Sequence, residues 1–360
     1  MSNLRTPGPT PVPPTVLAAM AQPMINHRGP EFAALIGGVT AKLKHFFQTE
    51  NDLLILTGSG TGGLEAAVVN LLSPGDQVLA VSIGVFGDRF AEIARVFGAQ
   101  VTKLDFPWGQ PADPAAIQAQ LAAHPQIKAV LVTHNETSTG VTNDLESISQ
   151  AVRGFDKLLV VDAISSVGSL DLPADRWGCD MVIGGSQKGW MVPPGLVFVT
   201  VSPKAWQAAT QARMPRFYWD LASAKRTLER GQTPATPAVS ILYGLVESLR
   251  LMMEEGLPGI VERHRQVAER CRQGAKALGL ELFARPGYES NTVTAVKVPS
   301  GVDAKALLKA LREKHDIVLA GGQASLSGKI FRIGHLGYVY EEDIDEVLAA
   351  LREELPAATK

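Results

Sequence analysis

Residues 181–201 read Met-Val-Ile-Gly-Gly-Ser-Gln-Lys-Gly-Trp-Met-Val-Pro-Pro-Gly-Leu-Val-Phe-Val-Thr-Val. Two apolar runs, residues 181–183 and 196–201, predict two buried strands with a single lysine, Lys188, between them. Small neighbours leave room for a bulky group, and apolar surroundings lower the pKa of an ammonium group, as an amine nucleophile requires. A lysine between strands is more often a solvated surface charge. This stretch alone therefore leaves both interpretations open.

A second apolar run, residues 158–161, ends in Asp162. An acid that closes a buried strand lies at the carboxyl edge of a sheet, where α/β proteins bind ligands. Pyridoxal 5'-phosphate needs a lysine for its Schiff base and a carboxylate that keeps its ring nitrogen protonated. Lys188 and Asp162 are therefore the predicted catalytic pair for this cofactor.

A glycine-rich turn, Thr-Gly-Ser-Gly-Thr-Gly-Gly at residues 57–63, follows the predicted strand 53–56 and precedes a predicted helix, 64–72. Such a turn presents unpaired amide groups at the positive end of the helix dipole, which suits a phosphate group. It has neither Walker nor dinucleotide-fingerprint spacing, and by itself it is as typical of a plain strand-to-helix connection. Beside a lysine and aspartate pair, the phosphate interpretation is favoured.

Three segments together, residues 161–163, 185–189 and 193–195, resemble the class V aminotransferases, in particular the alanine–glyoxylate and serine–glyoxylate (serine–pyruvate) branch. The likeness runs from Pro7-Gly8-Pro9 to Arg332-Ile333-Gly334. It implies an α/β protein with fold type I of the PLP-dependent transferases, in which a large domain with a mostly parallel sheet is followed by a smaller C-terminal α+β domain.

The expected organisation is an N-terminal arm at residues 1–15, a large PLP-binding domain at 16–255 and a small domain at 256–360. Alternating strands and helices between residues 53 and 201 are typical of a mostly parallel sheet covered on both faces. Five prolines within residues 1–14 favour an extended arm, with a floppy tail as the alternative.

The resemblance also implies roles for individual residues. The phosphate loop and its neighbour Gln187 hold the phosphate, Phe86 stacks on the pyridine ring, and Thr137 lies near the ring hydroxyl. Relatives often have histidine at Thr61 and tryptophan at Phe86; phenylalanine offers less stacking area and no N–H. The full set of expected cofactor contacts is Ser59, Gly60, Thr61, Phe86, Thr137, Asp162, Ile164, Gln187, Lys188, Thr233 and Thr236.

Two of these contacts, Thr233 and Thr236, are expected to reach the partner's phosphate across a dimer interface. Thr236 before Pro237 also fits a helix N-cap, which is the structural alternative.

For the substrate, the resemblance implies that Arg332 binds the α-carboxylate and that Gly8 and His27 lie nearby. An arginine inside an apolar strand is otherwise explained by a buried salt bridge, and a His-Arg pair at residues 27–28 by a solvated turn.

Composition excludes several classes of protein. Among 360 residues, 46% are hydrophobic and 19% charged, which is ordinary for a soluble enzyme, and a net charge of −2 gives no reason to expect nucleic acid or an anionic membrane as partner. The two cysteines, Cys179 and Cys271, have neither disulfide nor metal-site spacing, so no metal is expected. No secretion signal or membrane-spanning run is recognisable, and the expected location is cytoplasmic.

The sequence therefore predicts a homodimeric PLP-dependent aminotransferase that moves an amino group from alanine or serine to glyoxylate or pyruvate. Alternatives are another class V enzyme that uses aspartate or a purine-catabolic amine donor, and a non-catalytic subunit with the same fold. A cysteine desulfurase is disfavoured because residues 321–328 contain no cysteine. A dehydrogenase is disfavoured because no dinucleotide fingerprint is present.

Overall fold

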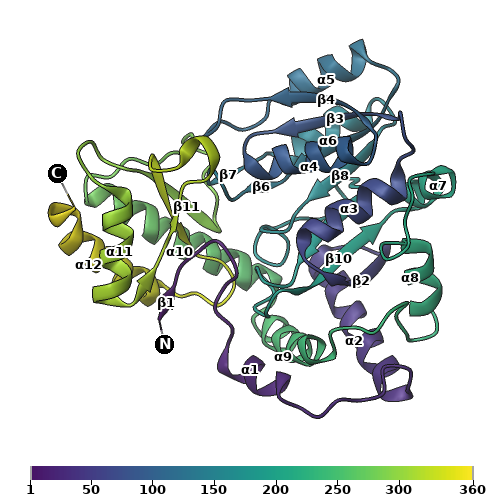
Figure 1. Cartoon of the computed structure of the whole chain (residues 1–360), viewed down its shortest axis with the longest axis horizontal. Coiled ribbons are helices and arrows are strands. Elements are labelled where there is room, and N and C mark those ends of the chain that lie inside the picture. Colours follow the sequence, from purple (N-terminus) through teal and green to yellow (C-terminus); the bar gives the residue numbers. More distant parts are fainter. Residues whose placement is uncertain (1, 359–360) are drawn as a thin grey trace.

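The computed structural model describes residues 2–358. Met1 of the predicted arm and Thr359 and Lys360 of the predicted small domain lie outside the described part. Its largest sheet has seven strands in the order β2-β10-β9-β8-β5-β3-β4 (Figure 1). β10 is antiparallel to its neighbours β2 and β9, whereas the pairs from β9 to β4 are parallel. The prediction of a mostly parallel sheet is confirmed. The strands are β2 (Asp52–Gly58), β3 (Gln77–Ser82), β4 (Gln100–Asp105), β5 (Ile127–Thr133), β8 (Leu158–Asp162), β9 (Met181–Gly185) and β10 (Gly195–Val201).

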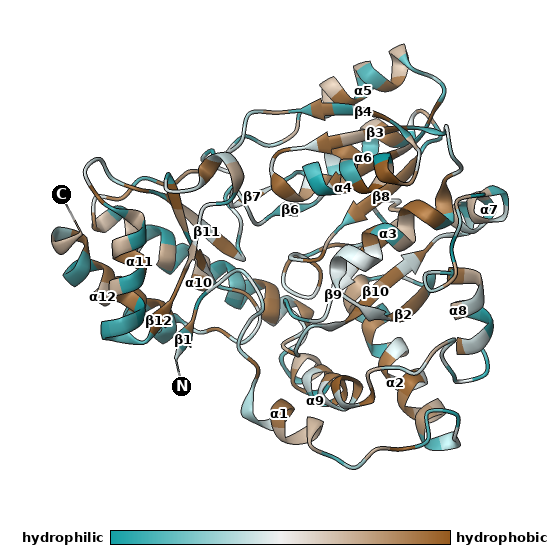
Figure 2. Cartoon of the chain, in the orientation of Figure 1, coloured by the Kyte–Doolittle hydropathy of each residue, from teal (hydrophilic) through white to brown (hydrophobic). Residues whose placement is uncertain are grey.

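Successive residues of these strands enter two different cores. Leu53 and Ile55 of β2 belong to one apolar cluster, whereas Leu54 and Leu56 belong to the other. Side chains alternate across a strand, so both faces of the sheet are buried. Figure 2 shows the corresponding contrast between largely hydrophobic strands and surrounding helices that carry hydrophilic stretches.

Helices cover both faces of the sheet. The first core is shared with α2 (Pro30–Phe47), α5 (Pro114–Ala123), α6 (Leu145–Arg153) and α9 (Val239–Glu255), and α1 (Pro14–Met20) packs on α9. The second core is shared with α3 (Gly60–Leu71), α4 (Val85–Val96), α7 (Pro203–Gln211) and α8 (Leu221–Leu228).

The C-terminal part forms a smaller layer beside the large sheet (Figure 1). A three-stranded sheet, β11-β14-β13, packs with three helices around a third apolar core. Its elements are α10 (Leu257–Ala277), β11 (Val293–Lys297), α11 (Ala304–His315), β12 (Ile317–Val318), β13 (Ala320–Gly321), the 3-10 helix η1 (Ala324–Leu326), β14 (Ile330–Gly334) and α12 (Glu341–Ala357).

The proline-rich N-terminal segment connects the two parts. β1 (Asn3–Leu4) pairs in parallel with β12, and the amide of Gly334 donates to the carbonyl of Arg5. Further along, the amide of Thr10 donates to the carbonyl of Gln187 at 3.1 Å. The segment therefore runs from the small sheet to the loop that carries Lys188.

Several helices differ from the sequence-based expectation. α3 begins at Gly60 rather than residue 64, so the glycines that predicted a turn lie inside the helix. They allow close packing there, since a Cβ on Gly60 would collide with Ile164, and one on Gly63 with Val197 and Ile183. α4, β4 and α7 were not predicted at all. The alternative that Thr236 caps a helix is wrong, since α9 begins at Val239 with Ala238 as its N-cap.

Two short strands complete the described chain, β6 (Asn135–Glu136) and β7 (Val141–Thr142), which pair with each other just beyond the end of β5. Across residues 2–358, no helix combines the length and the apolar character that crossing a membrane requires.

Candidate active site

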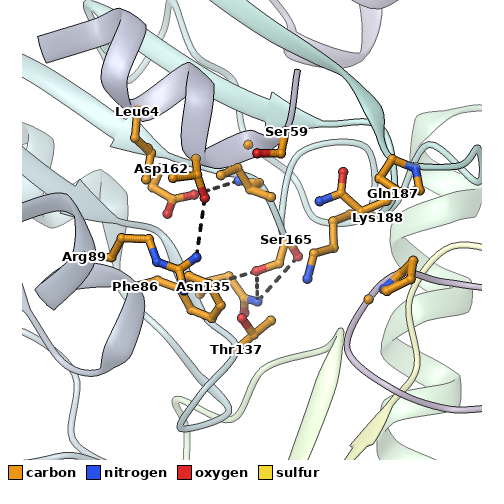
Figure 3. A pocket seen from close by; sticks show the side chains of 16 residues that line it. Ser59, Leu64, Phe86, Arg89, Asn135, Thr137, Asp162, Ser165, Gln187 and Lys188 are labelled. Carbon is orange, nitrogen blue, oxygen red and sulfur yellow. Dashed lines mark hydrogen bonds between the residues drawn. The ribbon is translucent and has the colours of Figure 1, made fainter. Parts of the chain in front are cut away.

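A cavity of about 210 Å³ lies at the carboxyl ends of the parallel strands (Figure 3). Asp162 is the last residue of β8, Ser59 follows β2, and Lys188 follows β9. Parallel strands end at the same edge of a sheet, which brings these distant segments together. The lining residues are Gly8, Pro9, Ser59, Gly60, Thr61, Leu64, Phe86, Arg89, Asn135, Thr137, Asp162, Ile164, Ser165, Gln187, Lys188 and Pro194.

Asp162 is a buried acid whose carboxylate accepts one hydrogen bond from the residues that the structure describes. Asp162 is only 3% exposed, and its Oδ1 accepts a hydrogen bond from the amide of Ile164 at 3.0 Å. Burial raises the pKa of this carboxyl to about 7, and the negative charge of Glu136 adds to the rise. A cationic group in the cavity would restore the charged form of Asp162.

Lys188 is likewise buried, at 9% exposure. Desolvation lowers the pKa of its amine to about 8, so roughly a tenth of it is uncharged and nucleophilic at pH 7, far more than for an exposed lysine. The amine donates a hydrogen bond to the carbonyl of Pro7, and a Cβ on Gly8 would collide with the lysine side chain. Gly8 therefore lies against the reactive amine, as expected for a residue at the site.

The first turn of α3 presents free amide groups to the cavity. Ser59 is its N-cap residue in an extended conformation, and no side chain caps the turn. Nearby, the buried amide oxygen of Gln187 has no hydrogen-bond partner among the described residues. The uncapped backbone amides are donors that a bound phosphate ester can satisfy, whereas the Gln187 oxygen is an acceptor and would instead need a donor. The residues present therefore fit the phosphate end of PLP.

Helix α4 contributes Phe86 and Arg89 to the opposite wall. The guanidinium group of Arg89 lies 4.9 Å from the centre of the Phe86 ring, and its Nη1 is 3.5 Å from the hydroxyl of Thr61. Arg89 also lowers the pKa of both Asp162 and Lys188. Figure 3 shows both side chains reaching into the cavity.

Arg332 lies next to this cavity without lining it. It is 6% exposed, and its guanidinium donates to the carbonyls of Thr137 at 3.0 Å and Gly321 at 2.9 and 3.0 Å. The amide oxygen of Gln323 is a third acceptor, at 3.3 Å. The alternative of a buried salt bridge is wrong within residues 2–358, because the acceptors are carbonyl oxygens rather than a carboxylate. The positive charge of Arg332 is therefore left uncompensated by a paired acid.

Comparisons with known proteins agree with this geometry. The sequence pattern described as aminotransferase class-V matches residues 3–347. The chain belongs to the class V aminotransferase family. It is 45% identical over 351 residues to the small subunit of a soluble hydrogenase of Synechococcus sp., covering 97% of this chain and 91% of that protein. It is 39% identical over 351 residues to a serine–glyoxylate aminotransferase of Methylorubrum extorquens, covering 94% and 87%.

A solved alanine–glyoxylate aminotransferase of Nostoc sp. has the same fold as this class V aminotransferase. The two chains are 33% identical with a TM-score of 0.95, and the match covers 98% of this chain and 95% of that one. The expected PLP-dependent transferase fold is confirmed by this likeness.

Three residues expected at the site of this class V aminotransferase lie away from the cavity of their own chain. His27 is a half-exposed residue in the connection between α1 and α2. The Thr233 hydroxyl donates to the carbonyl of Ala235 at 2.8 Å, and Thr236 is exposed. The cavity within one chain therefore contains none of the three.

Conversely, the cavity includes residues that sequence reasoning did not single out. Asn135 donates to the hydroxyls of Ser165 and Thr292, each at 2.9 Å, and so joins the large sheet to the small layer. Arg89 is the most important residue that was missed. The only sequence feature that could have indicated it is its position three residues after Phe86, about one helical turn away. The complete set of such lining residues is Pro9, Leu64, Arg89, Asn135, Ser165 and Pro194.

Within residues 2–358, no three His, Cys, Asp or Glu side chains are grouped so that they could hold a metal ion.

Proposed function

We propose that this class V aminotransferase is a PLP-dependent transaminase that moves an amino group from alanine or serine to glyoxylate or pyruvate. The observation that carries the proposal is the presence of Lys188 and Asp162 in one buried cavity, with pKa values shifted to about 8 and about 7. A poorly solvated amine can bind PLP covalently, and a buried acid can pair with the protonated nitrogen of its ring.

Each end of the cofactor has a candidate partner in the cavity. The amides of the α3 first turn and Gln187 would hold the phosphate, Asp162 the ring nitrogen, and Phe86 one ring face; the remaining proposed contacts are Thr137 and Ile164. When bound, PLP supplies an electron sink for charge that develops at the substrate Cα.

Lys188 has a further role in the proposed reaction. An amine with a pKa of about 8 can both accept and return a proton near neutral pH, which suits it to move the proton of the substrate Cα. Arg332 would hold the substrate carboxylate and so fix the direction of that Cα–H bond.

The proposal of small substrates is supported by relatives of the chain, which include a serine–glyoxylate aminotransferase and an alanine–glyoxylate aminotransferase.

The proposal includes a homodimer with active sites shared across its interface. Thr233 and Thr236 lie outside the cavity of their own chain. Two aromatic side chains earlier in the chain are exposed, Phe217 at 95% and Tyr218 at 52%. Large exposed aromatics are typical of association surfaces. Light scattering of the purified protein tests the dimer, and a cytoplasmic location is expected for it.

The decisive experiment replaces the lysine. Lys188→Ala should lower transamination at least about 1,000-fold, because the covalent link and the proton carrier are both lost. Lys305→Ala, in exposed α11, is the matched control and should keep full activity. Substantial turnover by Lys188→Ala would overturn the assignment.

A screen of single amino acids then identifies the donor. Each amino acid is added to the PLP-loaded protein without an acceptor, and the change in cofactor absorbance is followed. Alanine and serine should change the absorbance fastest; a stronger response to aspartate would instead favour the alternative class V activity.

A non-catalytic subunit is the second candidate, favoured by the similarity to the Synechococcus relative, which is named as the small subunit of a soluble hydrogenase. The same screen separates the two functions, since a non-catalytic subunit leaves the cofactor absorbance unchanged with every amino acid.

A further inference from the structure

Glu136 is a fully buried acid next to the cavity that the proposed reaction does not use. It is 0% exposed and lies in β6, between Asn135 and Thr137, both of which line the cavity. Its carboxylate has no ion-pair partner among the described residues, so its role must be sought in its hydrogen bonds.

Among the described residues, the Glu136 carboxylate accepts four hydrogen bonds, two at each oxygen. Oε2 accepts the amides of Phe86 at 3.0 Å and Gly87 at 3.2 Å, and Oε1 accepts the amide and the hydroxyl of Ser138 at 3.1 and 2.6 Å. Four donors around two oxygens favour the charged form, although burial raises the pKa of Glu136. The acid therefore acts as an anion at the positive end of α4.

Glu136 and Ser138 together replace the missing local cap of α4. The N-cap residue, Gly84, has no side chain to cap the helix, and the amide of Val85 donates to the Ser138 hydroxyl at 3.0 Å. The approach is so close that a Cβ on Gly84 would collide with Glu136 and Ser138. The first three amides of α4 are thus held by a segment fifty residues further along the chain.

The same segment fixes groups on two other sides of the cavity. Thr137 lines the cavity, and its carbonyl accepts Nη1 of Arg332 at 3.0 Å. A displacement of residues 136–138 would therefore move the Phe86 ring and the Arg332 guanidinium together.

The charge of Glu136 also reaches the reactive groups. It raises the pKa of Asp162 and of Lys188, while Arg89 and Arg332 lower that of Lys188. Asp162, Glu136, Arg89 and Arg332 are the charged groups that act on the lysine.

We propose that Glu136 is a positioning residue, which clamps the first turn of α4 so that the Phe86 ring forms one wall of the cofactor site, and which holds a fixed negative charge beside Lys188 and Asp162. This inference rests on the proposed PLP-dependent function. Phe86 would touch the cofactor, whereas Glu136 acts through Phe86 and through its charge.

The clamp is tested first in the cofactor-free protein by hydrogen exchange of single amides. Glu136→Gln should speed exchange at Phe86 and Gly87 about tenfold, the loss expected when a charged acceptor becomes neutral. Ser138→Ala is the matched control and should affect Val85 more than Phe86. Unchanged exchange at Phe86 and Gly87 in Glu136→Gln would overturn the clamp.

The charge is tested by the rate at which the cofactor-free protein combines with PLP, measured against pH. Removal of the negative charge favours the neutral amine, so Glu136→Gln should shift the profile of Lys188 to lower pH, whereas Ser138→Ala should leave it in place. PLP should also bind Glu136→Gln about tenfold more weakly, with altered circular dichroism of the bound ring. Identical pH profiles for the wild type and Glu136→Gln would contradict the electrostatic role.

A third variant keeps both tests open if Glu136→Gln does not fold. Glu136→Asp retains the charge but shortens the side chain, and should therefore speed exchange at Phe86 without shifting the pH profile; the opposite pattern would refute the inference. If the wild type binds no PLP, the proposed function fails, while the hydrogen-exchange result still decides on the clamp. If the wild type transaminates and all variants match it, only the role of Glu136 is lost.

Discussion

Helices α3 and α4 both begin at the wall of the same cavity, and their first turns are satisfied in opposite ways. The turn at Ser59 has no side-chain cap, whereas the amides of Val85, Phe86 and Gly87 at α4 are taken by Glu136 and Ser138. An uncapped helix N-terminus can accept an anionic ligand, but one already capped by a carboxylate cannot. This difference supports the proposal that α3 holds the phosphate, while α4 presents the Phe86 ring and Arg89 to the cavity.

The largest effect is expected when a charge is added at the open end. Ser59→Asp should weaken PLP binding about 100-fold, because the new carboxylate both caps the amides and repels the phosphate. Ser59→Asn is the control, since it provides a neutral cap of the same size and should cost less. Binding is measured by titration of the cofactor-free protein; equal affinities for the two variants would place the phosphate elsewhere.

A medium effect is expected when the capped end is crowded. Gly84→Ala should destabilise the cofactor-free protein by about 1–3 kcal/mol, because its Cβ would collide with Glu136 and Ser138. Gly37→Ala, in α2 with open space around the new Cβ, should instead stabilise by about 0.5–1 kcal/mol. Denaturant unfolding gives both values, and a stabilised Gly84→Ala would show that the clamp is looser than described.

The smallest effect concerns the acid between the two helices. The pKa of Asp162 rises from its ordinary 3.8 to about 7 in the folded protein, so the folded state holds a proton that the unfolded state releases. The contribution of this carboxyl to stability is therefore present below pH 3.8 and lost as the pH rises through 7. The melting temperature of the cofactor-free protein should fall over this range by about 5 °C more than that of Asp162→Asn.

Lys188 does not obscure that measurement. Its pKa is lowered from 10.5 to about 8, so its effect on stability changes only above that pH. Parallel melting curves for the wild type and Asp162→Asn would mean that the buried acid is already charged.

Local sequence patterns were sufficient to predict an element where its structure depends only on residues near it in the chain. The apolar pattern of residues 77–82 predicts a strand and that of residues 239–255 predicts a helix, and these are the bounds of β3 and α9. Such periodicity depends only on near neighbours in the chain. The start of α7 could also have been predicted locally. Ser202 is its N-cap residue, whose hydroxyl accepts the amide of Ala205 at 3.0 Å, and a proline follows in the first turn.

Helix α4 shows why other elements could not be predicted. Its first turn contains Gly87 and lacks a capping residue of its own, which reads as a loop. The cap comes from Glu136, fifty positions away in the chain, and no local pattern indicates such a partner.

The sequence by itself determined several strands of the large sheet, the lysine and aspartate that follow or end such strands, and the glycine-rich turn, since each depends on residues close together in the chain. Only the tertiary structure decided that Glu136 caps α4, that Arg89 enters the cavity, and that Arg332 is held by the carbonyl of Thr137, 195 positions away. These contacts join side chains on separate elements, and they form only when the parallel strands bring their ends to one edge.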